Sequence, residues 1–335
     1  MNNELKVVWL IVILSIGNSI VWADSIQPQF GLPVNCEMGK ECFIQNYVDH
    51  DAGPGYKDFR CGHLSYDGHK GTDFRVKTRA QMQLGVPVLA AASGKVIGVR
   101  DGEPDVAVSI RGKESLAGKD AGNGVVIDHG NGWRTQYSHL RQGSVKVLMG
   151  QIVKKGLALG MIGESGNADF PHVDFAVRYH DRVVDPFRPQ DLDACFGGDT
   201  PNTLWDTPTS ALLRYQPTGI LAFGFSTAVP SRLEVDNGIR ITPLYIDDPA
   251  LVFWVELFGA DHGDRWFLDI TDPSGKKLVQ SHEMQEGDKA VAIFAAGIKT
   301  SHSLLDPGLY RAQFRLMRGN QVIIDQGAQI QVNVR

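Results

Sequence analysis

The sequence predicts an all-β protein with two domains. Short runs of β-branched and aromatic residues, separated by Gly and Asn-Gly turns, fill residues 62–187, where helical periodicity is nearly absent. Strict alternation of apolar and polar residues marks residues 310–316 and 328–334. The chain has 335 residues, of which 43% are hydrophobic and 21% charged, which fits about two globular domains and excludes a disordered protein.

The first 23 residues predict an export signal. A positively charged flank precedes an apolar run over residues 7–14, and Ala23 provides a small residue for cleavage before Asp24. An uncleaved membrane anchor is the alternative, but the apolar run is short and residues 17–18 break it. We expect an exported chain that begins at Asp24, lies in the periplasm or at the cell wall, and has no membrane span.

Because the chain is expected to be exported, its four cysteines are expected to form disulfides: an even number of cysteines in an oxidising compartment is usually paired. Four cysteines allow three pairings. Cys36 and Cys42 are close enough for a small loop, which would leave Cys61 to pair with Cys195. A cysteine metal site is the alternative, but the sequence has no C-x-x-C pair to support it.

The N-terminal half predicts an irregular segment followed by a β domain. Gly, Pro and Asp are frequent in residues 24–61, which predicts irregular structure tied by the small disulfide loop. Residues 62–198 form the first domain, with a hairpin turn at Asn131-Gly132 and a loop insertion over residues 101–123. Its expected strands include residues 86–90, 94–99, 124–128 and 145–148.

The C-terminal part predicts a second domain that begins after a linker. Residues 199–209 are rich in Pro and Thr and mark the linker, and residues 210–335 form the domain. Six or seven strands at sandwich-like spacing indicate an immunoglobulin-like β-sandwich. They include residues 251–257, 266–270, 290–295, 310–316 and 328–334, with a turn at residues 272–275. No titratable cluster in this domain indicates a site.

Three groups of polar residues in the first domain indicate metal chemistry. His69 and Asp73 lie four apart in a Gly-rich segment, where an imidazole nitrogen and a carboxylate oxygen can bind one zinc ion. His172 and Asp174 lie two apart in an expected strand and therefore share one face. His139 ends another β-rich run. Each group alone fits a solvated loop, an exposed strand face or a structural histidine, but together they offer ligands and proton-transfer groups for metal-assisted hydrolysis.

These residues belong to an ordered series of motifs that resembles the lysostaphin-type (LytM-like) zinc metallopeptidases, which cut peptidoglycan. The similarity covers about residues 62–187. In the family's order, the motifs are His69-x-x-x-Asp73-Phe74, Gly85-Val-Pro-Val-x-Ala90 with Gly94-x-Val96, residues 122–132, Tyr137-x-His139-Leu140, residues 153–166 with their glycines, and Pro171-His172-x-Asp174-Phe175. The resemblance implies that this domain is a barrel-sandwich hybrid (duplicated hybrid motif).

The resemblance also implies a role for each site residue. The family's H-x-x-x-D motif supplies two ligands of one zinc ion, here His69 and Asp73. The histidine of Tyr-x-His-Leu and the first histidine of His-x-His act around the water and the tetrahedral intermediate, which maps to His139 and His172. The family's third ligand is the second histidine of His-x-His. Asp174 stands at that position, and we expect it to be the third ligand.

Aspartate can replace histidine as a ligand at position 174. Its carboxylate oxygen binds zinc and lies as many bonds from Cα as the Nδ1 atom of histidine. A second carboxylate neutralises the divalent ion, which should raise the pKa of the bound water. We therefore expect a slower enzyme, a different metal preference, or no metal binding. His63 and His180 remain alternative ligands, and His129 is interpreted as structural.

The leading hypothesis is a monomeric, exported metallo-endopeptidase that hydrolyses the peptide cross-links of peptidoglycan during cell-wall remodelling. The alternative is a catalytically degenerate member of the fold that binds the cell wall or activates another wall hydrolase. A carrier or phosphotransfer domain is a third hypothesis, which would need a modifiable Lys or a His pair without a metal-binding Asp. The formal net charge of −5 gives no general attraction to nucleic acid.

Overall fold

The computed structural model describes residues 27–190, 192, 195, 202–239, 242–300 and 304–335. The chain is nearly all β, with 45% of residues in strands and 9% in helices, which confirms the predicted fold class. The predicted signal peptide, residues 1–23, lies outside the described residues. In the part of the chain that the structure describes, no helix is long and apolar enough to span a membrane.

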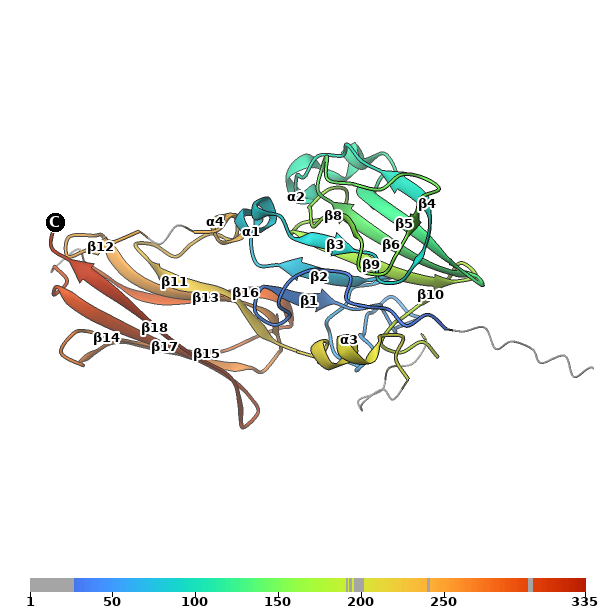
Figure 1. Cartoon of the computed structure of the whole chain (residues 1–335). Coiled ribbons are helices and arrows are strands. Elements are labelled where there is room, and N and C mark those ends of the chain that lie inside the picture. The colour runs from blue at the N-terminus through green and yellow to red at the C-terminus, as the bar shows by residue number, and fades with distance from the viewer. Residues whose placement is uncertain (1–26, 191, 193–194, 196–201, 240–241, 301–303) are drawn as a thin grey trace, which may run out of the picture.

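Two lobes lie side by side in the molecule (Figure 1). We call residues 27–218 the N-terminal lobe and residues 219–335 the C-terminal lobe. Helix α1 (Arg79–Leu84) of the first lobe contacts helix α4 (Arg232–Asn237) of the second. Thr78 caps α1 by accepting a hydrogen bond from the amide of Gln81, and Ser231 and Glu234 form a capping box on α4.

One large antiparallel sheet organises the N-terminal lobe. Its strands follow the order β1 (Cys42–Asn46), β2 (Thr72–Val76), β9 (His172–Tyr179), β6 (Trp133–Leu140), β5 (Asn123–Gly130), β4 (Gly94–Arg100) and β7 (Ile152–Val153), with β10 (Arg182–Val184) paired to β9. A second sheet pairs β3 (Pro87–Leu89) with β8 (Ala158–Met161). Val173, Phe175 and Val177 alternate along β9 and are fully buried in the core of the lobe.

Several elements of this lobe differ from the sequence prediction. Residues 145–148 form no strand. This segment makes a single backbone hydrogen bond of the kind found between paired strands, from the amide of Lys146 to the carbonyl of Leu159, and Val147 packs into the core. The segment expected to be irregular contributes β1 to the main sheet. The loop insertion carries helix α2 (Val108–Arg111) and a 3₁₀ turn (Lys113–Leu116).

The hairpin prediction at Asn131-Gly132 is confirmed. The two residues connect β5 to β6 and have φ angles of 51° and 84°. A two-residue hairpin turn of this type requires positive φ at both positions, which Asn and Gly adopt most easily. The hairpin sets the register of β6 against β5, and β6 in turn pairs with β9.

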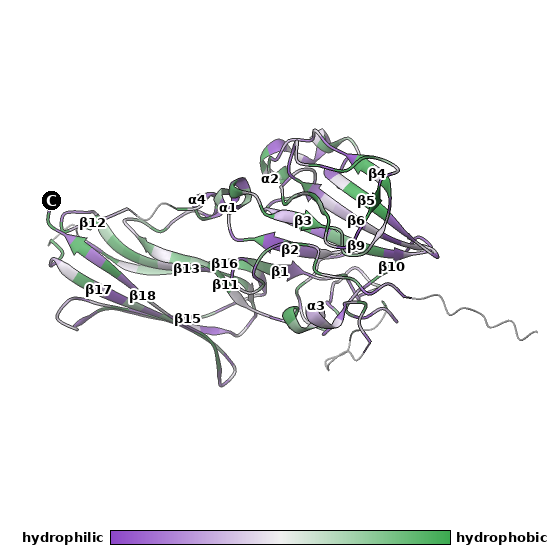
Figure 2. Ribbon diagram, in the orientation of Figure 1, coloured by the Kyte–Doolittle hydropathy of each residue, from purple (hydrophilic) through white to green (hydrophobic). Residues whose placement is uncertain are grey.

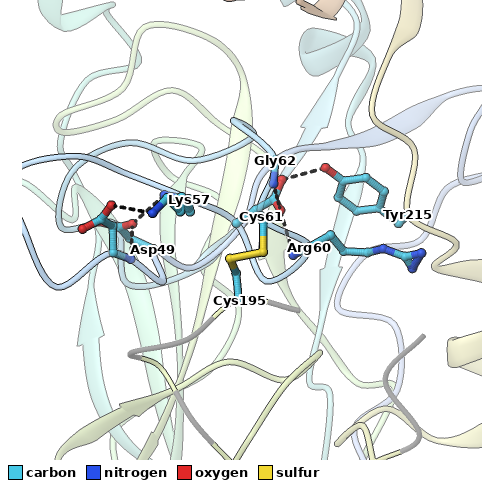
Figure 3. The surroundings of a disulfide bond; sticks show 9 residues. Asp49, Lys57, Arg60, Cys61, Gly62, Cys195 and Tyr215 are labelled. Atoms are coloured by element: carbon cyan, nitrogen blue, oxygen red, sulfur yellow. Dashed lines mark hydrogen bonds and ion pairs between the residues drawn. A yellow bond between two sulfur atoms is a disulfide. The ribbon is translucent and has the colours of Figure 1, made fainter. Parts of the chain in front are cut away.

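Both disulfides have the expected pairing. Cys36 bonds to Cys42 and Cys61 bonds to Cys195. Figure 3 shows the second bond beside Gly62 and Tyr215. The Tyr215 hydroxyl donates to Asp58 Oδ2 over 2.7 Å, and Asp58 accepts from the amide of Gly62 over 2.9 Å. This disulfide therefore ties the segment before His69 to the end of the lobe.

The C-terminal lobe consists of a three-stranded and a five-stranded sheet around a second core. The strands are β11 (Gly219–Ser226), β13 (Ala250–Ala260) and β16 (Lys289–Lys299) in one sheet, and β12 (Leu244–Tyr245), β18 (Gln321–Asn333), β17 (Gly308–Arg318), β14 (Arg265–Thr271) and β15 (Lys277–Met284) in the other. Figure 2 shows hydrophobic and hydrophilic residues alternating along β17 and β18. The immunoglobulin-like topology stays a prediction.

The two cores meet where the lobes join. Leu221 and Phe258 of the C-terminal lobe belong to the core of the N-terminal lobe, and the Phe43 and Phe258 rings lie 5.6 Å apart. Trp205, in the segment predicted as a linker, is also buried in this core, and helix α3 (Thr207–Leu212) follows it. The two lobes are therefore held together by apolar packing as well as by the chain that connects them.

Candidate metal centre

Strand register brings the predicted site residues onto one face of the main sheet. Asp73 on β2 lies directly opposite Asp174 on β9, and Ser138 on β6 lies opposite Asp174 on its other side. His172 precedes Asp174 by two residues and therefore points to the same face. The opposite face of β9 packs in the core, so the polar set is fixed by the same alternation that buries the apolar residues.

Three of the predicted ligands converge. His69, Asp73 and Asp174 each direct one ligand atom into a group whose members all lie within 4.8 Å of one another. His69 Nε2 is 3.2 Å from Asp73 Oδ1. These two atoms and Asp174 Oδ1 are buried and have no hydrogen-bond partner among the described residues. Buried polar atoms without partners are costly, and a cation between them removes that cost, so one nitrogen and two oxygens fit zinc.

In His69 and in Asp73, the second polar atom of the side chain is hydrogen-bonded to the end of β1 or to the residue that follows it. His69 Nδ1 donates to the carbonyl oxygen of Tyr47 over 2.8 Å, which leaves Nε2 as the ligand nitrogen. The Asn46 side-chain amide donates to Asp73 Oδ2 over 2.7 Å, which leaves Oδ1 for a metal. Sequence reasoning missed Asn46 and Tyr47, because nothing in the local pattern of a strand far from the motifs indicates this contact.

Asp174 reaches the centre because the facing residue is a glycine. A Cβ atom at Gly71 would lie 1.7 Å from Asp174 Oδ1, far inside van der Waals contact. Any side chain at position 71 would therefore displace the Asp174 carboxylate. Gly71 is a second residue whose role the sequence alone did not indicate.

His139 and His172 lie together beside the three ligands. Their ring centroids are 4.7 Å apart, and His172 Nε2 is 3.5 Å from Asp73 Oδ1. His172 Nδ1 donates to the carbonyl oxygen of Phe170 over 2.8 Å, and His139 Nδ1 donates to that of Ser165 over 2.7 Å. In both rings Nε2 is then the nitrogen available for proton transfer.

A bulge in β6 turns His139 toward the site. Asn123 pairs with Leu140 and Val125 with Tyr137, so β6 has one residue more than β5 over this stretch. His139 has a φ angle of 62°, which is uncommon for a residue with a side chain. In regular alternation His139 would point away from the face that carries Ser138, and the bulge changes its direction.

The electrostatics of the metal-free centre favour a cation. Burial opposes protonation of His69, but Asp73, Asp174 and the hydrogen bond to the Tyr47 carbonyl together raise the pKa of His69 to about 9. Burial also opposes ionisation of Asp73, but His69, His172 and the hydrogen bond from Asn46 together lower the pKa of Asp73. Burial and the charge of Asp73 raise the pKa of Asp174 to about 7. In the metal-free protein at low pH, His69 and Asp174 are therefore protonated, and these protons bring positive charge to the place where a divalent ion would bind.

The pKa values of His139 and His172 are both lowered, which favours the neutral form of each ring. Burial and the neighbouring His172 lower the pKa of His139 to about 3. Burial also lowers the pKa of His172, although Asp73 opposes this effect. Neutral rings are the forms that accept a proton, as a general base must.

These pKa values predict that metal affinity falls steeply with pH. His69 and Asp174 must each lose a proton to bind the ion, and their pKa values are about 9 and about 7. The affinity is therefore complete above the His69 pKa and falls about tenfold per pH unit as pH drops toward 7. Below 7 both groups are protonated and the loss steepens to about a hundredfold per unit.

Zinc affinity would be measured by competition with a chromophoric chelator from about pH 5.5 to about pH 8.5. Asp174→Asn is the matched control, because it keeps the side-chain size and removes one titrating group. Its affinity should fall only about tenfold per unit below pH 7. If the zinc affinity of the wild type also fell by only about tenfold per pH unit below pH 7, as in Asp174→Asn, Asp174 would not be a ligand that must lose a proton.

The remaining histidines of the described residues lie outside this centre. His129 Nδ1 donates to the Ser93 carbonyl over 2.9 Å and Nε2 accepts from the Thr135 hydroxyl over 2.8 Å, as a structural residue would. His63 Nε2 faces Asp261 Oδ1 of the C-terminal lobe over 3.0 Å, and His180 lies in the turn after β9. Neither His63 nor His180 joins the His69 group.

A groove begins beside the centre and runs over β6, β5 and β4. Its cavity has a volume of about 260 Å³. One of its lining residues, Ser138, lies opposite Asp174 in the sheet. The lining residues are Gly98, Val99, Arg100, Ala121, Gly122, Gly124, Val125, Val126, Gln136 and Ser138.

Comparisons with known proteins place the metal centre in a shared region. Residues 67–186 match the family model described as Peptidase family M23. Over 120 residues, or 36% of this chain, the sequence is 33% identical to the peptidoglycan DD-endopeptidase ShyB of Vibrio cholerae and to the cell division protein DipM of Caulobacter vibrioides. The matched segment spans only 22% and 18% of these relatives. A zinc-containing peptidase from Vibrio cholerae shares 26% identity over 48% of this chain and 38% of its own, with a TM-score of 0.30.

Proposed function

Since residues 67–186 form a domain of peptidase family M23, we propose that this protein is an exported zinc metallo-endopeptidase that hydrolyses the peptide cross-links of peptidoglycan. One observation carries the proposal. Three ligand atoms, on His69, Asp73 and Asp174, are buried and gathered without hydrogen-bond partners in the described chain, beside the imidazoles of His139 and His172.

His69, Asp73 and Asp174 would hold one zinc ion. When bound, zinc supplies Lewis-acid chemistry, because it polarises a carbonyl group and lowers the pKa of a water molecule. Asn46 and the Tyr47 carbonyl keep Asp73 and His69 in the orientation that binding requires.

His172 is the better placed of the two histidines to accept the proton of the attacking water. Its Nε2 lies 3.5 Å from Asp73 Oδ1, so the imidazolium that forms is stabilised by a carboxylate. Protonated His172 can then donate a hydrogen bond to the tetrahedral oxyanion and pass its proton to the leaving amine. His139, which burial keeps neutral, accepts a hydrogen bond from the water and orients it.

The substrate and the compartment are part of the same proposal. The name of the relative ShyB supports a peptidoglycan peptide as substrate, and the groove beside Ser138 offers room for it. Two disulfides support an oxidising compartment, such as the periplasm or the cell surface, where peptidoglycan lies. We propose that the protein acts there as a monomer.

Asp174 favours a second candidate function, in which the domain binds the wall or activates another hydrolase without cutting. A second carboxylate reduces the charge of the ion and therefore its effect on a water molecule. Against this function, His69, Asp73, His139 and His172 keep the arrangement that catalysis needs.

We expect the chain from Asp24 to release peptide fragments from purified cross-linked peptidoglycan when zinc is present. A chelator should abolish release, because the three ligands alone cannot polarise a carbonyl, and added zinc should restore it. Mass spectrometry of the fragments identifies the cleaved bond. Absence of release by folded, zinc-loaded protein would overturn the peptidase proposal, and stimulation of a wall amidase by that protein would support the second function.

A further inference from the structure

One short segment after β8, residues 163–165, contacts both histidines that lie beside the three ligands. The His172 backbone amide donates to the Gly163 carbonyl over 3.0 Å. The His139 ring donates from Nδ1 to the Ser165 carbonyl over 2.7 Å. A shift of this segment would therefore move the backbone of His172 and weaken the hydrogen bond that selects the ring tautomer of His139.

The middle residue of this segment is a buried glutamate with an arginine partner. Glu164 is fully buried, and Arg79 is the first residue of α1. Arg79 Nε donates to Glu164 Oε2 over 2.7 Å, and Arg79 Nη2 donates to Glu164 Oε1 over 2.5 Å. Two parallel bonds of this kind fix the direction of the carboxylate as well as its distance, because both must form at once.

Arg79 also contacts the stretch of chain that precedes His172. Its Nη2 donates to the Asp169 carbonyl over 3.4 Å. The next residue, Phe170, accepts the hydrogen bond from His172 Nδ1 with its carbonyl and stacks its ring on the His172 ring, with centroids 4.4 Å apart. A single guanidinium therefore connects the two stretches of chain that contact the histidines.

The effect of this ion pair on position outweighs its effect on stability. A buried ion pair adds little net stability, because the cost of removing two charges from water offsets their attraction. What the pair does provide is geometry, since a bidentate contact tolerates little displacement of either partner. Arg79 Nη1 also donates to Asn237 Oδ1 of the C-terminal lobe over 3.4 Å, so the guanidinium is held from the other side as well.

We propose that Arg79 and Glu164 are positioning residues, whose bidentate contact holds residues 163–165 in the place that orients His139 and His172. Neither residue belongs to the ligand group of His69. The inference rests on the proposed peptidase function where it concerns turnover. It assigns a role to helix α1, which carries none of the motif residues.

The test replaces an arginine with lysine in two full-length variants. Arg79→Lys keeps the positive charge and removes the planar group that makes two parallel bonds. Arg318→Lys is the matched control, because Arg318 makes a bidentate contact over 2.9 Å and 2.8 Å with a fully buried carboxylate, that of Asp264 in the C-terminal lobe. We expect Arg79→Lys to lower kcat about tenfold with unchanged KM and zinc affinity, and Arg318→Lys to keep kcat near the wild-type value. Equal kcat in Arg79→Lys and Arg318→Lys would overturn the proposal.

A double-mutant cycle tests whether the two residues act through one contact. The double variant Arg79→Gln with Glu164→Gln should lose no more kcat than the more damaging single variant, whereas losses that multiply would contradict the proposal. Glu164→Gln leaves no buried charge without a partner, so it should fold even where Arg79→Gln does not. Its kcat should then fall, while Asp264→Asn, the corresponding change in the control pair, keeps the wild-type value.

Nitrogen NMR of the histidine rings tests the inference without turnover, on full-length protein with zinc added. The two ring nitrogens of His139 should give the separate shifts of one fixed tautomer in the wild type, and these shifts should approach each other in Arg79→Lys as the tautomers exchange. His129, whose Nδ1 donates to the Ser93 carbonyl, is the internal reference and should not change. If the wild type cuts no peptidoglycan, the proposed function fails, but a change at His139 without one at His129 still establishes the link. Unchanged His139 shifts in Arg79→Lys overturn the link, whatever the activity.

Discussion

Replacing His172 with alanine should lower kcat by about a thousandfold while zinc affinity stays near the wild-type value. General acid–base groups contribute about 10²–10⁴-fold, and His172 is the ring with a carboxylate 3.5 Å from its Nε2. His172 is absent from the proposed ligand set, so the bound metal should remain. Steady-state hydrolysis of a soluble cross-linked muropeptide gives kcat, and elemental analysis gives the metal content.

His129→Ala is the matched control for this experiment. His129 lies on β5, which is separated from β9 by β6 in the same sheet, and its two ring nitrogens are hydrogen-bonded to Ser93 and Thr135. Its removal should lower thermal stability and leave kcat of the folded protein almost unchanged. Equal losses of kcat in the two variants would mean that His172 has only a structural role.

Two substitutions at position 174 should have opposite effects on metal binding. Asp174→Ala removes a ligand and leaves His69 and Asp73, so zinc affinity should fall by at least about a hundredfold. Asp174→His should keep zinc bound through two histidines and one aspartate. Because one carboxylate fewer neutralises the ion, its effect on the pKa of a water molecule increases, and kcat should rise.

The pH profile distinguishes this electronic effect from a change in packing. In Asp174→His the acidic limb of kcat should move to lower pH, because the attacking water loses its proton more easily. If the acidic limb of the kcat profile stayed at the same pH while kcat fell, the histidine ring would be shown not to fit beside Gly71. Turnover by Asp174→His alone would assign the wild type to the non-catalytic function and identify Asp174 as the cause.

Local patterns in the sequence predicted much of the N-terminal lobe. The alternation in residues 172–177 placed His172 and Asp174 on one face, because side chains in any strand alternate whatever the strand pairs with. The Asn131-Gly132 turn and the cysteine spacing were also readable, since each depends on residues close in sequence or on a small number of pairings. The prediction of a strand at residues 145–148 was wrong, because the same apolar pattern occurs in an irregular segment that packs into the core and in a strand of a sheet.

Only the tertiary structure decided which distant residues complete the centre. Asn46, the last residue of β1, and Tyr47, which follows it, orient Asp73 and His69 from a segment that the sequence predicted as irregular. The direction of His139 depends on one extra residue in β6, which is a matter of register between two strands.

The physical reason for this division is the range of the interactions. The all-β class, the shared strand face and the ligand types follow from the chemistry of neighbouring residues, which the sequence states directly. The register of the strands and the position of a bulge depend on how whole strands pack. Packing is decided by the sum of many weak contacts over the folded chain. The sequence therefore indicated which residues are the proposed ligands, and the tertiary structure decided how their side chains are oriented.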